Sequence, residues 1–358
     1  MKPENEYPVA SAPAAARPAA LPHHCTFEEG EWRALARHWY PVAYAREVAD
    51  KPLARTLLDQ ELILYRTTGG KVVVARDLCI HRGVPLRLGW QEGDELVCAY
   101  HGFRYGADGR CTRVPAQPGL PVPKKLCLET YPSRERYGII WTCLAPDAEP
   151  ASGLPEWAEL EDPAYRMMHD PPQEWAVTAG RMMENFIDVG HFSWIHTGTF
   201  GNRERPEVPS YEVERRPGGF HVEYPYLAAN RAEAALGDGD TIQRWMTYDL
   251  HLPLACRLTI DFGEGRRHVI FNAPTPVSRR RTRIFFFIAR NFDHQVPARQ
   301  LLDWENAVLA EDKPIVESQR PEELPVDLSE EFHIRCDRFA TAFRTAMKEL
   351  GLGRTYSA

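Results

Sequence analysis

Two short segments of the sequence each combine one cysteine with one histidine. Cys79 and His81 are separated by one residue, Cys98 and His101 by two, and sixteen residues lie between His81 and Cys98. Two thiolates on one iron and two imidazoles on the other hold a [2Fe–2S] cluster whose reduction potential is raised by the histidines. A closed Zn2+ site accepts the same four ligands. The pattern therefore predicts a metal centre and favours the iron–sulfur cluster over zinc.

A second possible metal site lies near residue 190. His191 and His196 are five residues apart, which is not the spacing of one helical face, and they follow Asn185 and Asp188. If a helix ends near Gly190, both imidazoles can converge on one ion. A carboxylate from elsewhere would complete a triad of two histidines and one carboxylate, which leaves coordination positions open for O2. A pair of hydrogen-bonded core histidines is the structural alternative.

The first set of ligands lies among short predicted strands. Residues 61–66, 71–76 and 137–142 are rich in β-forming side chains, and Gly69-Gly70 supplies a turn between the first two. Residues 145–155 are rich in proline and acidic side chains, which marks a linker. The pattern predicts a small all-β domain that ends near this linker.

The second set is followed by longer predicted strands, at residues 211–216, 220–226, 243–250, 256–262, 267–272 and 283–290. Pro217-Gly218-Gly219 and Gly263-Glu264-Gly265 supply turns between neighbouring strands. We therefore expect an antiparallel sheet and not alternating βαβ units. Apolar residues recur at positions 332, 336, 339, 343, 347 and 350, which predicts a long helix that covers the sheet. Asp327 and Glu330 fit a capping box at its start, and Gly351 fits its end.

Length and composition set broader limits. The 358 residues, of which 44% are apolar, suit two domains, and the net charge of -7 argues against a nucleic-acid partner. The eight cysteines do not suggest a disulfide scaffold. The longest apolar run, 284–289, is far shorter than the ~20 residues that span a bilayer. We expect a cytoplasmic protein with no membrane partner, divided into a disordered arm (1–26), a cluster domain (27–150) and a catalytic domain (151–358).

The segments around both ligand sets resemble those of Rieske-type non-haem iron oxygenases. Cys79-Ile80-His81-Arg82-Gly83 and residues 98–105 with Gly109 resemble the two cluster loops, although Phe103 stands where that family more often has an indole. Residues 310–319 resemble the helix that carries the third iron ligand, so Asp312 is the implied carboxylate. The implied fold class is α+β: an N-terminal all-β Rieske [2Fe–2S] domain and a C-terminal helix-grip-like domain, whose antiparallel sheet is covered by helices.

The resemblance also implies cofactors and partners. They are a [2Fe–2S] cluster, a mononuclear Fe(II), O2 as co-substrate, and electrons from NAD(P)H through a separate reductase or ferredoxin. No Gly-x-Gly-x-x-Gly follows a predicted strand, so the chain lacks its own nicotinamide site. A homotrimer is implied, in which Asp188 accepts hydrogen bonds from His191 and from His101 of a neighbouring subunit. Asn185 is expected to shape the pocket, and Glu184 to form an ordinary ion pair.

Within the family, the chain looks most like the group without a second structural subunit, which includes bacterial caffeine N-demethylases and vanillate and dicamba O-demethylases. Oxidative N- or O-demethylation of a small molecule is therefore the first prediction. C–H hydroxylation of an alkaloid or another natural product is the alternative, because the same ligands serve both. An electron carrier or zinc-stabilised binding module is a second alternative. Residues 225–246 and 284–287 are expected to line the pocket, and five arginines near the cluster to attract an acidic ferredoxin: Arg82, Arg87, Arg104, Arg110 and Arg113.

Overall fold

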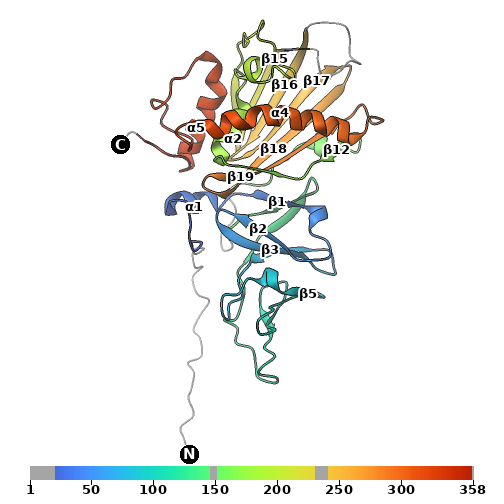
Figure 1. The fold of residues 1–358 in the computed structure, drawn as a ribbon, viewed down its shortest axis with the longest axis vertical. Coiled ribbons are helices and arrows are strands. Elements are labelled where there is room, and N and C mark those ends of the chain that lie inside the picture. Colours follow the sequence, from blue (N-terminus) through green and yellow to red (C-terminus); the bar gives the residue numbers. More distant parts are fainter. Residues whose placement is uncertain (1–20, 146–150, 230–240, 357–358) are drawn as a thin grey trace, which may run out of the picture.

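The computed structural model describes residues 21–145, 151–229 and 241–356. A smaller β-rich domain and a larger domain with one broad sheet stack along the long axis of the molecule (Figure 1). This arrangement confirms the predicted fold class. No helix among these residues is long and apolar enough to cross a membrane.

The N-terminal domain contains a short helix and three antiparallel sheets. Helix α1 spans Glu29–Leu35. The first sheet joins β1 (Tyr40–Tyr44), β11 (Ile139–Thr142) and β10 (Ser133–Arg136). The second joins β2 (Leu53–Leu57), β3 (Gln60–Arg66), β4 (Val72–Arg76) and β9 (Thr130–Tyr131). The third joins β5 (Trp90–Glu92), β6 (Glu95–Val97), β7 (Arg104–Tyr105) and β8 (Cys111–Arg113). The three predicted strands of this domain are β3, β4 and β11.

The C-terminal domain is built on an eight-stranded antiparallel sheet in the order β12-β19-β18-β17-β16-β15-β14, with β13 also paired to β19. Its strands are β12 (Arg166–His169), β13 (Gln173–Trp175), β14 (Val213–Arg216), β15 (Gly219–Ala229), β16 (Thr241–His251), β17 (Ala255–Gly263), β18 (Arg266–Ser278) and β19 (Arg281–Arg290). All six predicted strands are present. The first residue of β15 is Gly219. A side chain would not fit at this position, because a Cβ would lie 1.8 Å from the Leu250 carbonyl oxygen.

Helices cover one face of this sheet. They are α2 (Ala179–Ile187), α3 (Phe192–Ile195), α4 (Ala298–Ser318) and α5 (Arg338–Glu349). Helix α4 runs across the strands, and α5 lies beside one end of it (Figure 1). Single-turn 3-10 helices span Ala45–Glu47, Leu86–Leu88, Ala158–Leu160 and Arg335–Asp337.

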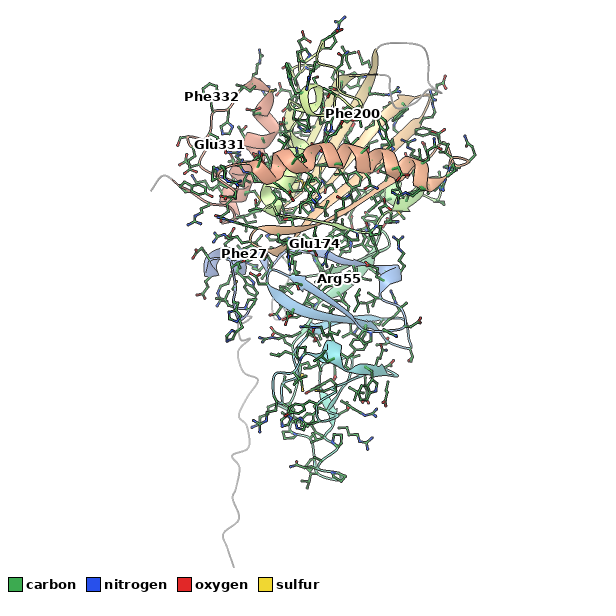
Figure 2. The ribbon with its side chains drawn as sticks, in the orientation of Figure 1. Phe27, Arg55, Glu174, Phe200, Glu331 and Phe332 are labelled. Atoms are coloured by element: carbon green, nitrogen blue, oxygen red, sulfur yellow. The ribbon has the colours of Figure 1, made fainter. Side chains whose placement is uncertain are left out.

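The last helix differs from its prediction at the start. It begins at Arg338 and not near Asp327, because the Asp327 carboxylate accepts hydrogen bonds from the backbone and hydroxyl of Ser329 and closes a local turn. Phe332, expected on the apolar face, is 91% exposed and projects from the preceding segment (Figure 2). The helix ends as predicted, with Gly351 at φ 74°.

The two domains share packed contacts. The β18–β19 hairpin reaches the N-terminal domain, where the backbone of Leu58 and Asp59 donates to the carbonyls of Pro276 and Val277 at 2.8 Å each. Arg55 and Glu174 lie at the same junction (Figure 2). The predicted disordered arm falls mostly on residues 1–20, outside the described residues. Residues 21–26 pack against the protein: Thr26 donates from its backbone and hydroxyl to Asp59, each at 2.7 Å.

Candidate active site

The two Cys–His segments form loops with the same hydrogen bonds. In the first loop, the backbone of Cys79 donates to the Val84 carbonyl, and Gly83 donates back to the carbonyl of Cys79. Cys98, Phe103 and Gly102 repeat this pattern in the second loop. Gly83 and Gly102 both adopt φ 68°, which favours glycine and lets the chain reverse after each histidine. The loops thus place each thiol beside an imidazole.

The four side chains differ in depth. Cys79 and Cys98 are buried, whereas His101 is exposed and His81 is half-buried. The Nδ1 atoms of His81 and His101 face each other at 3.2 Å. The Tyr105 hydroxyl lies 3.0 Å from the Cys79 sulfur, and the ring of Phe103 stacks on His81 at 4.5 Å. The pair of buried thiols and the pair of outward imidazoles fit a [2Fe–2S] cluster with its histidine-bound iron toward the surface.

Geometry also separates this cluster from a zinc site. In the described part of the chain, one group of three or more Cys, His, Asp or Glu residues has all its ligand atoms within 4.8 Å of one another, and it consists of His191, His196 and Asp312. The Cys–His set is not among the groups whose ligand atoms converge in this way in the described residues. A tetrahedral Zn2+ needs all four ligands at about 2.0–2.3 Å from one centre.

The second predicted set does converge. Helix α2 ends at Ile187, and α3 starts at Phe192, so the chain turns between the two histidines as expected. The Nε2 atoms of His191 and His196 lie 3.1 Å apart, and each lies 3.4 Å from Oδ1 of Asp312, which comes from α4. All three side chains have little exposure. Two imidazoles and one carboxylate on one side of a centre suit a ferrous ion with open positions.

Electrostatics fit a cation at this triad. Burial alone would lower the pKa of His191, but its contacts with Asp188 and Asp312 outweigh this and raise the pKa to about 9. Desolvation lowers the pKa of His196. Because ligation requires neutral imidazoles, a bound metal ion replaces the proton that the acids otherwise attract to His191. Asn185 donates from Nδ2 to Oδ1 of Asp312 at 3.3 Å and so orients this carboxylate.

Each histidine of the triad has a second carboxylate behind it. Nδ1 of His191 lies 3.4 Å from Oδ2 of Asp188, as the sequence predicts. Nδ1 of His196 lies 3.0 Å from Oε2 of Glu311, which the sequence analysis missed. Glu311 also accepts from the Thr199 hydroxyl at 2.7 Å and the Gly198 backbone at 3.0 Å. Because carboxylates only accept, a neutral imidazole whose Nδ1 faces one of them keeps its proton on Nδ1 and directs Nε2 to the centre, as metal binding requires.

Glu184 and the arginines near the cluster loops form ion pairs within the chain. Glu184 forms the expected ion pairs, accepting from Arg344 at 2.9 Å and from Arg181 at 3.2 Å. Three of the five arginines near the cluster pair with acids of the same domain: Arg87 with Asp77 and Glu61, Arg104 with Glu92 and Glu95, and Arg110 with Asp108. Their charges are therefore largely matched within the chain.

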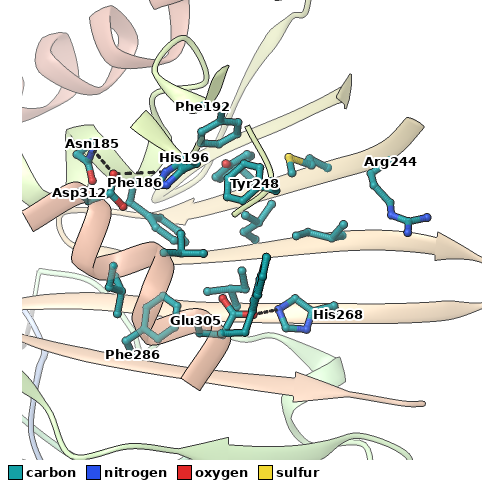
Figure 3. A pocket seen from close by; sticks show the side chains of 18 of the residues that line it. Asn185, Phe186, Phe192, His196, Arg244, Tyr248, His268, Phe286, Glu305 and Asp312 are labelled. Atoms are coloured by element: carbon teal, nitrogen blue, oxygen red, sulfur yellow. Dashed lines mark hydrogen bonds and ion pairs between the residues drawn. The ribbon is translucent and has the colours of Figure 1, made fainter. Parts of the chain in front are cut away.

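An apolar pocket opens from the triad between α4 and the sheet (Figure 3). Its lining is mainly apolar with a few polar groups, as is usual in small-molecule sites. The predicted stretches contribute Arg244, Met246 and Phe286. Phe285 and Phe287 instead face the opposite side of β19, within a separate apolar cluster. Strand alternation explains this division.

The pocket also contains a polar cluster that the sequence analysis did not predict. Nε2 of His268 lies 3.0 Å from Oε1 of Glu305, and Arg290 donates from Nε to Nδ1 of His268 at 2.6 Å. All three side chains are buried. Desolvation lowers the pKa of His268, and the neighbouring Arg290 lowers it further. The register pairs His268 with Arg290 across β18 and β19, which strand patterns alone do not reveal.

Comparisons with known proteins agree with both parts of the chain. Residues 38–132 match the family model "Rieske [2Fe-2S] domain", and residues 175–352 match "Vanillate O-demethylase oxygenase C-terminal domain". The chain is 32% identical to methylxanthine N1-demethylase NdmA of Pseudomonas putida, over 89% of this chain and 90% of the relative. It is 28% identical to a vanillate O-demethylase oxygenase subunit of Pseudomonas sp. strain HR199, over 79% and 85%.

A solved structure supports the same relationship. NdmA of Pseudomonas putida CBB5 with caffeine superposes with a TM-score of 0.81 at 30% identity, covering 90% of this chain and 92% of that one. The two family matches together include the cluster loops, the triad and most of the large sheet. The chain therefore belongs to the Rieske non-haem iron oxygenases.

Proposed function

We propose that this chain is the terminal oxygenase of a demethylase, which removes a methyl group from nitrogen or oxygen of a small organic molecule. The observation that carries the proposal is the triad of His191, His196 and Asp312 at the inner end of an apolar pocket. The relatives named above, which demethylate methylxanthine and vanillate, support this reaction over others.

The proposed roles follow from the contacts. Cys79, Cys98, His81 and His101 would hold the [2Fe–2S] cluster, and His191, His196 and Asp312 the mononuclear iron. When bound, these centres supply electron transfer and activation of O2. Asn185 orients the Asp312 carboxylate, and the apolar walls exclude water and hold the methyl group near the triad.

The reaction balances with one O2, two electrons and two protons. One oxygen atom enters the methyl C–H bond, and the other leaves as water. The resulting hydroxymethyl group on nitrogen or oxygen then splits into formaldehyde and the demethylated product. Because members of this family receive electrons from a reductase or ferredoxin, the two electrons come from NAD(P)H through such a partner.

The assay uses the full chain with a Rieske-system reductase, NADH, and a panel of methylxanthines, methoxybenzoates and N-methylated heterocycles. A substrate should release formaldehyde in proportion to the NADH oxidised. A hydroxylated product without formaldehyde would establish C–H hydroxylation, which the same triad can support. NADH consumption that never depends on an added compound would refute an oxygenase role.

We further infer a homotrimer with head-to-tail contacts. The β5–β8 sheet with its cluster loops lies at the end of the molecule remote from α4 (Figure 1). Beside the triad, a groove is lined by Asp188, Trp194 and Ile334, and the latter two are more than half exposed. A neighbouring subunit's cluster domain would fill this groove and bring its His101 to Asp188. Light scattering should give three times 40.9 kDa, and a monomer would refute this assembly.

Two other assignments are also proposals. The eight cysteines are free in the described residues, and the need for an NAD(P)H-dependent donor likewise favours the cytoplasm. We place the domain boundary near residue 150, within the gap between the two family matches. Limited proteolysis that cut mainly elsewhere would contradict this boundary.

A further inference from the structure

Helix α4 presents two acids to the pocket. Its buried stripe consists of Leu302, Glu305, Leu309, Asp312 and Val316. The two acids are seven positions apart, so they lie on one face about 10 Å apart along the helix axis. Asp312 belongs to the triad, but Glu305 lies outside it. A carboxylate within an apolar stripe loses hydration, and this cost requires compensating partners.

The His268 ring places its protonated nitrogen next to Glu305. The guanidinium of Arg290 can only donate, so Nδ1 of His268 accepts and the ring proton lies on Nε2. Nε2 lies 3.0 Å from Oε1 of Glu305, a close polar contact that lacks the alignment of a hydrogen bond. The imidazole then has no further hydrogen-bonding atom to offer a ligand. Within the described part of the chain, no recorded hydrogen bond or ion pair reaches Oε2 of Glu305, which therefore offers an acceptor to the pocket.

The surface between Glu305 and the triad is apolar. The pocket lining includes Phe186, Ile270, Phe286 and Val308. Glu305 and Asp312 project from the same helix into the pocket (Figure 3). A flat or compact organic body suits these walls. A ligand carboxylate at the Glu305 end would meet a like charge, whereas an N–H group would meet an acceptor. Arg244 also lines the pocket, with its guanidinium 4.2 Å from the centroid of the Phe262 ring.

We propose that Glu305, which lies beside His268, selects the substrate, and that the substrate presents an N–H donor at the end remote from the carbon that is oxidised. The donor belongs to an amine, an amidine or an N–H heterocycle. This inference rests on the proposed function and narrows its substrate class: nitrogen compounds are favoured over carboxylates such as methoxybenzoates.

The test is calorimetric titration of the oxidised holoenzyme without reductase, using two matched pairs of ligands. The first pair is 4-methoxybenzylamine and 4-methoxybenzoate, which have similar size and opposite charge. The second is 7-methylxanthine, which has ring N–H groups, and caffeine, which has none. We expect the N–H member of at least one pair to bind at least tenfold more tightly. Preference in the first pair indicates a cationic amine, and preference in the second a neutral heterocycle.

A variant assigns the preference to one side chain. Glu305→Gln should weaken binding of the preferred ligand about tenfold to hundredfold, the usual range for losing a charge-assisted hydrogen bond. The cluster absorption and the iron content should not change. Asp303→Asn is the matched control, because Asp303 lies on the same helix but is exposed and pairs with Arg299. This control should bind as the wild type does.

Several results would overturn the proposal. They are equal or undetectable binding within both pairs, tighter binding of the benzoate, or a preference that survives in Glu305→Gln. If this variant does not fold, the wild-type titrations still decide the matter. If Glu305 only stabilised the fold, Glu305→Gln would lower the melting temperature and leave the ratio of ligand affinities unchanged. Since no turnover occurs, a failure of demethylation in the formaldehyde assay would not alter these titrations.

Discussion

Glu311 offers a sharp test of how the triad is organised. Its carboxylate accepts from the His196 imidazole, the Thr199 hydroxyl and the Gly198 backbone. In Glu311→Gln the amide oxygen can keep one or two of these contacts, and the amide nitrogen would face a donor. The loss of one hydrogen bond to a charged group costs about 1.5–3 kcal/mol. If the binding free energy of Fe2+ weakens by about 1.4–2.7 kcal/mol as a result, the affinity for Fe2+ falls about tenfold to hundredfold.

The measurement is a competition titration of Fe2+ against a chelator, with the [2Fe–2S] absorption followed in the same sample. We expect weaker Fe2+ binding and an unchanged cluster spectrum. Glu317→Gln is the matched control, because Glu317 also lies on α4 and accepts a backbone hydrogen bond, from Ala176 at 2.8 Å, but does not contact the triad. Wild-type affinity in Glu311→Gln, or equal losses in both variants, would refute the reasoning.

The remaining predictions concern the triad, electron transfer and acid stability. Asp312→Ala should lose the mononuclear iron and keep the cluster absorption; full iron content at both sites would exclude Asp312 as a ligand. Asp188→Asn should keep both metals and the proposed trimer but lose reductase-driven turnover; wild-type turnover in this variant would contradict a role of the Asp188 carboxylate in electron transfer. Burial lowers the pKa of His38 and His169 to about 4, so the unfolded chain takes up protons first as pH falls below about 6.5. For each of these histidines, the free energy of unfolding should therefore be about 2 kcal/mol lower at pH 5 than at pH 7. Urea unfolding of His169→Phe, which keeps a ring against Tyr44 and Phe287, should show a smaller loss, and an equal loss would contradict this assignment.

Side-chain chemistry made much of the site predictable. Cys79, His81, Cys98 and His101 are recognisable because few other functions need two thiols and two imidazoles at this spacing. Alternating apolar residues and glycine-containing turns also predicted six of the eight strands of the large sheet, and missed the short strands β12 and β13. Asp312 was found only through resemblance to a family segment, since a lone acid on a helix has no distinctive pattern.

The missed features depend on contacts between distant segments. Glu311 precedes Asp312 in sequence, but its role arises because the loop after His196 folds onto α4. The pairing of His268 with Glu305 requires the position of α4 over β18. At the last helix, the bonds from Ser329 to Asp327 favoured a turn over the helical spacing that the apolar residues suggested.

The hairpin that joins the domains limits how this enzyme can be re-engineered. Pro276 and Val277 accept backbone hydrogen bonds from Leu58 and Asp59, so a catalytic half made alone would leave these carbonyls and the adjoining apolar surface in water. In a chimera that exchanges the whole N-terminal domain, the new domain would have to reproduce these contacts between the domains, here called the seam. Grafting only the β5–β8 sheet with its two loops leaves the seam intact, and it is the smaller unit for adapting the oxygenase to a foreign electron donor.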